Sequence, residues 1–195
     1  MIFTDTVTFN YINDDIAELK SRVKYLRAVF GFSKKVYVKT YEDIMAMSQY
    51  IDYELPDWIK GISFSNRIWL LDKKSWVNDI DESITNLIVH EFTHIAIFNT
   101  FKVRCPIWIS EGLAVYYGRQ KVNSRIIKNF NYYSADYDSD GLYSQSYYII
   151  DFLMRKFGEA SIISHAIQCD DFCNDTLFGE ENIKALSDHL EDYYD

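Results

Sequence analysis

The stretch that decides the fold is DESITNLIVHEFTHIAIFNT, residues 81–100, whose middle is H-E-F-T-H at residues 90–94. Apolar residues recur through it at helical spacing, which predicts one helix that is buried nearly all round. Residues four apart on a helix share a face and lie about 6 Å apart along the axis, so His90 and His94 present both imidazoles to one ion. The Glu91 carboxylate then lies beside the ion, where it can take a proton from water.

Burial of these polar side chains needs an explanation. Two histidines and a glutamate in the middle of a buried helix cost free energy unless they have partners. A metal ion would remove that cost, and the alternative is a buried helix with two hydrogen-bonded histidines. We expect Asp81 to cap the helix and Glu82 to favour its positive N-terminal end.

A third ligand is predicted in PIWISEGLAVYYG, residues 106–118. A catalytic zinc usually takes three protein ligands and keeps the fourth position for water. If Pro106 starts a second helix, Glu111 falls on a face with apolar neighbours, and the alternative is a solvated helix glutamate. Gly112 costs about 1 kcal/mol relative to Ala in a helix interior. We expect a close approach of the two helices around an ion at this glycine.

The two motifs carry a family resemblance. H-E-x-x-H at 90–94 and W-x-x-E-G-x-A-x-Y at 108–116 resemble the gluzincin metallopeptidases, the thermolysin and aminopeptidase-N superfamily, and most closely its small bacterial peptidase MA-like members. The resemblance implies that His90, His94 and Glu111 bind one zinc ion per chain. It implies that Glu91 is the general base in hydrolysis of peptide bonds, with a peptide or protein as substrate.

The resemblance also predicts the fold class, α+β with a minimal gluzincin (zincin) arrangement. We expect one compact domain over residues 1–195, with an N-terminal α/β lobe (1–100) that holds a mixed sheet and a mostly helical lobe (101–195). The H-E-x-x-H helix is expected between the two lobes.

The sequence differs from metzincins, thermolysin-like enzymes and aminopeptidases at positions that are important in those families. A metzincin would need Gly in place of Ile97 and a third His in place of Thr100. Thermolysin-like enzymes carry an acid four residues after the ligand Glu, where this chain has Val115, so the partner that orients a ligand histidine must come from elsewhere. Aminopeptidases of the superfamily grip the substrate amine with a glutamate in G-x-M-E-N. The corresponding GISFSN, residues 61–66, has none, which weakens an aminopeptidase role.

The N-terminal half predicts alternating strands and helices. We expect a strand over 6–11, a helix from Asp14 or Asp15 to Phe30 that stops at Gly31, a strand over 35–40 and a helix over 41–50. A strand through 68–71 is expected as core and as site wall, and in gluzincins this region forms an edge strand to which substrate adds. The residues expected inside the two helices are Ile16, Leu19, Val23, Leu26, Phe30, Ile44, Met45 and Met47.

The C-terminal half predicts a loop and further helices. Residues 123–141 are polar enough for an exposed loop, which we interpret as a mobile lid. A helix over 142–157 should end at Gly158, followed by short helices over 162–167 and 182–193. Tyr143 is the first choice and Tyr147 the second for stabilising the oxyanion of peptide hydrolysis, and packing is the alternative for both. His165 is expected to be a satisfied core or rim residue.

Composition excludes several classes of function. The 195 residues carry a net charge of −9 without a basic run, which argues against nucleic acid or an anionic membrane as partner. No segment approaches 18 apolar residues, and the N-terminus lacks the pattern of a signal peptide, so a cytoplasmic location is expected. Three cysteines fit reduced thiols. The oligomeric state stays open.

Two alternatives to an enzyme remain at this point. One is a catalytically idle gluzincin-like domain that acts as a binding or regulatory module, against which the intact Glu91 argues. The other is a structural zinc protein, but closed structural sites usually use four Cys or His ligands.

Overall fold

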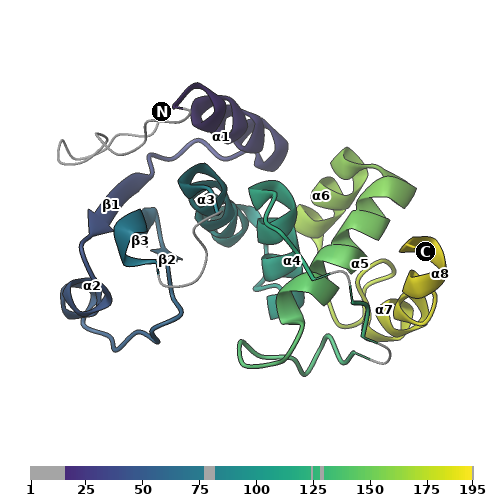
Figure 1. The fold of residues 1–195 in the computed structure, drawn as a ribbon. Coiled ribbons are helices and arrows are strands. Elements are labelled where there is room, and N and C mark those ends of the chain that lie inside the picture. Colours follow the sequence, from purple (N-terminus) through teal and green to yellow (C-terminus); the bar gives the residue numbers. More distant parts are fainter. Residues whose placement is uncertain (1–15, 77–81, 124, 128–129, 195) are drawn as a thin grey trace. The chain divides into compact units, whose positions relative to one another are not determined.

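The computed structural model describes residues 16–76, 82–123, 125–127 and 130–194 (Figure 1). The fold is α+β and mostly helical, with a small mixed sheet of three strands. By contact the chain separates into two compact units, residues 1–99 and 100–195. The predicted strand over 6–11 and the caps Asp14, Asp15 and Asp81 lie outside the described residues.

The first unit begins with α1 and holds the sheet. Its elements are α1 (Ile16–Phe30), β1 (Tyr37–Tyr41), α2 (Ile44–Ile51), β2 (Gly61–Phe64), β3 (Arg67–Leu71), the 3-10 helix η2 (Lys73–Ser75) and α3 (Ile84–Thr100). The predicted stripe of α1 is confirmed at its buried members Leu19, Val23, Leu26 and Phe30. The prediction that Ile16 is buried was wrong, since its side chain is 41 % exposed at the first turn of α1. Gly31 follows α1 with φ +65°, a backbone conformation that suits glycine at a helix end.

The sheet has the order β1-β3-β2. β1 runs parallel to β3, and β2 runs antiparallel to it through a two-residue turn at Ser65 and Asn66. The predicted strand through 68–71 is confirmed, but β3 is the middle strand because β1 pairs with its far side. The edge positions therefore belong to β1 and β2 in the described sheet.

Helix α2 packs on the sheet through contacts with β1 and β3 (Figure 1). The Asp43 side chain caps it by accepting a hydrogen bond from the Ala46 N–H at 2.8 Å. Met47 is fully buried as predicted, whereas Met45 is 69 % exposed. The Met45 prediction was wrong because residues two apart on a helix point to nearly opposite sides.

The second unit is built around α5. Its helices are α4 (Ile107–Gly118), α5 (Leu142–Phe157), α6 (Glu159–Gln168), α7 (Glu180–Ser187) and α8 (Leu190–Tyr194). α5 contacts α4, α6, α7 and α8 (Figure 1). Gly158 ends α5 with φ +84°, as the sequence predicted. The helix expected over 182–193 is instead two helices, which are interrupted at Asp188 and His189.

The core of the second unit is rich in aromatic side chains. Trp108 is completely buried, and its indole meets Tyr132, Tyr133 and Phe178 with ring centroids 5.6–6.3 Å apart. Such edge-to-face and tilted pairs add to the free energy gained by burying apolar area. None of the helices in the described ranges has the length and apolar character needed to cross a membrane.

Candidate metal centre

His90 and His94 lie one turn apart in the middle of α3. Their Nε2 atoms are 3.1 Å apart, and their ring planes are inclined by 82°. His90 is buried and His94 is half-buried. The almost fully buried Ile88 and Ile95 hold other sides of α3 in the core, which fixes the rotation of the helix about its axis. The predicted pair of imidazoles is therefore present, with both Nε2 atoms directed to a common region.

Glu111 follows from the start of α4. Pro106 is the N-cap and α4 begins at Ile107, within one residue of the predicted start. Glu111 is buried, 3 % exposed. His90, His94 and Glu111 each offer a ligand atom, and these atoms all lie within 4.8 Å of one another. No other group of three His, Cys, Asp or Glu side chains is arranged in this way among the residues that the structure describes.

The donor set fits zinc. Zn²⁺ binds nitrogen and oxygen at about 2.0–2.2 Å in a tetrahedral arrangement, which separates two ligand atoms by about 3.3 Å. The 3.1 Å between the two Nε2 atoms is close to this separation. Two imidazoles and one carboxylate also match the ligands of catalytic zinc centres, which keep a fourth position open. The group could therefore hold a metal ion, and its ligand types are compatible with zinc.

The surroundings of Glu111 favour a cation. Trp108, Ile109 and Val115 on the same helix are at most 2 % exposed. Burial raises the pKa of the Cys105 thiol to about 12, and the negative charge of Glu111 adds to the rise. A carboxylate in apolar surroundings gains free energy from a nearby positive charge. The apolar Val115 supplies no orienting carboxylate, as expected from the sequence.

Glu91 lies against β2, one of the two edge strands of the sheet. Its side chain is buried, 5 % exposed. A Cβ added to Gly61, the first residue of β2, would lie 3.2 Å from Glu91 Oε1 and 2.9 Å from Leu70 Cδ2. The missing side chain at Gly61 thus lets the Glu91 carboxylate approach the β2 backbone. Sequence reasoning noted the GISFSN segment for the glutamate that it lacks and missed this role of its glycine.

Gly112 has a different partner from the one predicted. A Cβ at this position would lie 2.5 Å from the Ser146 carbonyl oxygen and 2.6 Å from Ile150 Cγ1, both on α5. The close approach that requires glycine is therefore between α4 and α5. The prediction that Gly112 serves an approach of the H-E-x-x-H helix was wrong, since a glycine does not reveal which neighbour needs the space.

Tyr143 and Tyr147 lie one turn apart on α5. Tyr143 is 37 % exposed in the first turn. Tyr147 is half-buried, with its ring centroid 6.4 Å from that of Tyr116 and 5.6 Å from that of Tyr148. Burial, with a smaller contribution from Asp151, raises the pKa of Tyr147, so its hydroxyl keeps its proton at neutral pH. The ring contacts of Tyr147 are packing contacts, and an oxyanion role for either tyrosine stays a prediction.

The segment interpreted as a lid is tied to α5. Gln145 accepts a hydrogen bond from the Ile127 N–H at 2.9 Å and donates one to the Arg125 carbonyl at 2.8 Å. The Tyr148 hydroxyl donates to the Asn123 carbonyl at 3.0 Å. These bonds argue against free movement of the described part of residues 123–141. The signal in the sequence was the glutamine of Y-S-Q-S-Y, residues 143–147. Its side-chain amide can accept one hydrogen bond and donate another, so it can hold a neighbouring backbone segment in place.

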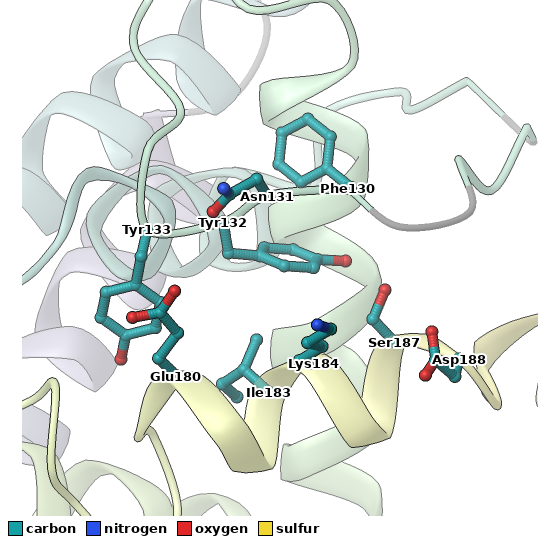
Figure 2. A pocket seen from close by; sticks show the side chains of 9 residues that line it. All are labelled: Phe130, Asn131, Tyr132, Tyr133, Glu180, Ile183, Lys184, Ser187 and Asp188. Atoms are coloured by element: carbon teal, nitrogen blue, oxygen red, sulfur yellow. The ribbon is translucent and has the colours of Figure 1, made fainter.

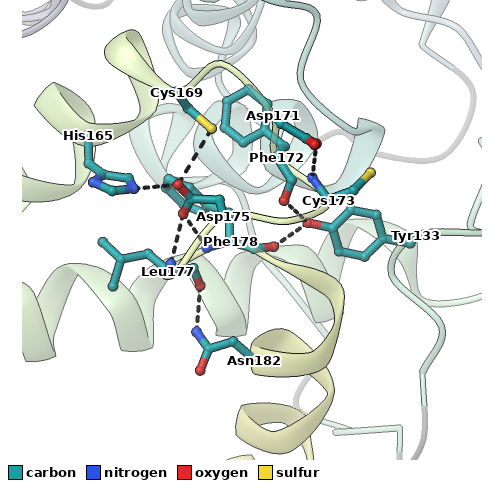
Figure 3. A network of polar contacts seen from close by, with 10 residues as sticks. All are labelled: Tyr133, His165, Cys169, Asp171, Phe172, Cys173, Asp175, Leu177, Phe178 and Asn182. Carbon is teal, nitrogen blue, oxygen red and sulfur yellow. Dashed lines mark hydrogen bonds and ion pairs between the residues drawn. The ribbon is translucent and has the colours of Figure 1, made fainter.

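A second polar cluster surrounds Asp175 (Figure 3). Its Oδ2 lies 2.7 Å from His165 Nε2, and the Cys169 thiol donates to the same oxygen at 3.7 Å. Its Oδ1 accepts hydrogen bonds from the N–H groups of Leu177 at 2.7 Å and Phe178 at 2.9 Å. The prediction that His165 is a satisfied core or rim residue is confirmed by this hydrogen bond.

Two comparisons of this chain with known proteins found no match. No protein-family model matches it, and no curated protein is significantly similar to it. The gluzincin resemblance therefore rests on the two motifs alone.

Proposed function

We propose that this protein is a zinc-dependent metallopeptidase. His90, His94 and Glu111 hold one zinc ion, and Glu91 is the general base. The observation that carries the proposal is the grouping of the three ligand atoms within 4.8 Å of one another, with a buried glutamate next to the first ligand on the same helix. A binding module would have no use for that glutamate.

Bound zinc would supply a Lewis acid that makes a water molecule acidic near neutral pH and polarises the substrate carbonyl. Glu91 accepts the proton of the attacking water on a carboxylate oxygen, and the water oxygen bonds to the amide carbon. The protonated Glu91 then donates the proton to the amine as the C–N bond breaks. Burial of Glu91 against Gly61 suits both steps, because proton transfer needs a carboxylate that is held in a fixed position.

The position of β2 supports a peptide as substrate. β2 is one of the two edge strands of the described sheet, and its first residue lies against Glu91. An extended peptide that pairs with this edge would gain main-chain hydrogen bonds and bring a scissile amide near the base. Tyr143 or Tyr147 would then donate a hydrogen bond to the developing oxyanion.

Cleavage of a peptide library tests the proposal. Zinc-loaded wild type should cleave internal peptide bonds, and Glu91→Gln should lose at least about 10³-fold in kcat/KM because it lacks the base. Glu181→Gln, an exposed glutamate on α7, is the matched control and should keep full activity. Absence of cleavage by the zinc-loaded wild type, over the whole library, would contradict the proposal and favour the idle binding module.

A further inference from the structure

A cavity of about 230 Å³ lies in the second unit, between residues 130–133 and α7 (Figure 2). Its apolar wall is formed by the rings of Phe130 and Tyr132 and by Ile183, which is 1 % exposed. Pockets for drug-sized ligands have volumes of about 300–1,000 Å³. The volume therefore suits a smaller molecule that has an apolar part.

Two buried hydroxyls at this cavity have hydrogen-bonding capacity to spare. Ser187 is 5 % exposed, and its Oγ has no hydrogen-bond partner among the described residues. Burial raises the pKa of Tyr132, and the neighbouring Ser187 hydroxyl opposes this rise, so the two hydroxyls lie near each other. The Tyr132 hydroxyl donates only a long bond, 3.5 Å, to the Gln145 carbonyl. A buried hydroxyl without a partner costs free energy that a polar ligand group would recover.

Charged side chains of alternating sign form the rim. Glu180, Lys184 and Asp188 follow one another at four-residue spacing along α7, which places them on one face about 6 Å apart along the axis. Figure 2 shows all three beside the cavity, with Ser187 between Lys184 and Asp188. Lys184 makes no ion pair with any residue that the structure describes. One positive and two negative groups are thus available next to the unpartnered hydroxyl.

These features select among ligand classes. A nucleotide or other polyanion would face two carboxylates and a single lysine. A divalent cation would find the two carboxylates about 12 Å apart along the helix with an ammonium between them. A purely apolar molecule would leave the hydroxyls unsatisfied. A small molecule with one carboxylate, one ammonium and an apolar side chain gives a partner to the lysine, to one of the two carboxylates, to the Ser187 hydroxyl and to the apolar wall.

We infer that this cavity binds a free α-amino acid with an aromatic or branched apolar side chain. The ligand carboxylate pairs with the Lys184 ammonium and accepts a hydrogen bond from the Ser187 hydroxyl. Its ammonium pairs with Asp188 or Glu180, and its side chain packs on Tyr132 and Ile183. The site lies within the second unit and needs neither zinc nor Glu91, so a test of this site is independent of the peptidase proposal.

Titration of the purified full chain with L-phenylalanine, followed by calorimetry and by amide chemical shifts, tests the inference. The account predicts saturable binding with Kd on the order of 1 mM, as expected for a ligand of this size, and shifts confined to residues 130–133 and α7. Phenethylamine and 3-phenylpropionate each lack one charged group, and each should bind at least about tenfold more weakly.

Variants separate this site from non-specific binding. Lys184→Gln and Ser187→Ala should each raise Kd by about tenfold, through the loss of a charge partner and of a hydrogen bond respectively. Glu181→Gln lies on the same helix but does not line the cavity, and it should leave Kd unchanged. The melting temperature of each variant verifies folding. Equal binding of phenethylamine, no effect of Lys184→Gln, or no saturable binding at 20 mM would overturn the inference.

Discussion

The group of His90, His94 and Glu111 and the polar cluster around Asp175 both combine histidine with carboxylate side chains, but in different arrangements. Around Asp175, both carboxylate oxygens are hydrogen-bonded by the chain itself, from His165 and from two backbone N–H groups. On α3, the two histidine Nε2 atoms face each other at 3.1 Å, and Glu111 brings a third ligand atom near them. Polar atoms that each have a hydrogen-bond partner within the chain indicate a structural cluster. Convergence of several ligand atoms indicates a metal centre, and the histidine count alone does not distinguish the two.

The largest expected effect is on zinc affinity. His90→Ala removes one of three ligands and should weaken zinc binding by at least about 10³-fold, because each ligand bond is strong and the remaining two leave the ion exposed. Competition with a chromophoric chelator measures it. His165→Ala is the matched control and should leave the affinity unchanged. If both variants weakened zinc binding equally, the distinction between the two clusters would fail.

The next effect is on stability. Asp175→Ala leaves the N–H groups of Leu177 and Phe178 without their acceptor and breaks the hydrogen bond with His165, so it should lower the free energy of unfolding by about 2–3 kcal/mol. Urea denaturation measures the change. The exposed Asp171 also accepts a backbone hydrogen bond, and Asp171→Ala should have a clearly smaller effect. Zinc content should be the same in both variants, and its loss in Asp175→Ala would show that the clusters are coupled.

Activity should respond to the contact between Gly61 and Glu91. In Gly61→Ala the new Cβ crowds Leu70 and Glu91 Oε1, so the base moves by a few tenths of an ångström and kcat should fall by about tenfold. Zinc content should not change. Ser63→Ala on the same strand is the control. Wild-type kcat in Gly61→Ala would show that this glycine does not position the base.

The smallest effect is the pH dependence of stability. Burial alone would raise the pKa of Asp175, but hydrogen bonds from Phe178, Leu177 and His165 lower it below its ordinary value of 3.8. A folded-state pKa below the unfolded one stabilises the fold above pH 3.8, and that contribution is lost as pH falls further towards the folded pKa. Urea denaturation between pH 5 and pH 3 should therefore show a steeper loss of stability in wild type than in Asp175→Asn. Identical slopes would contradict this assignment.

Local patterns in the sequence predicted much of the site. The apolar period of residues 84–100 and the proline at 106 located α3 and α4 within one or two residues, and the ligand spacing follows from helix geometry. The strand through 68–71 and the end of α5 at Gly158 were also recognised. Each of these depends on residues that are close in sequence.

Features that depend on distant residues were not predictable. Gly112 serves an approach to Ser146, and Gln145 holds backbone groups near residue 126, so neither partner is visible in the local pattern. Met45 was misplaced because a two-turn helix gives too few positions to define its buried face. The cavity at α7 arises from packing of residues 130–133 on a helix some fifty positions later, and no motif marks it.

Zinc content is the most direct test of the central claim. Elemental analysis of purified, zinc-reconstituted protein should give one zinc ion per chain for wild type and for Glu91→Gln, and a large loss for Glu111→Ala. That result would separate the ligand role of Glu111 from the base role of Glu91. A wild type that binds no zinc after reconstitution, or a Glu111→Ala variant that binds it as tightly as wild type, would contradict the account.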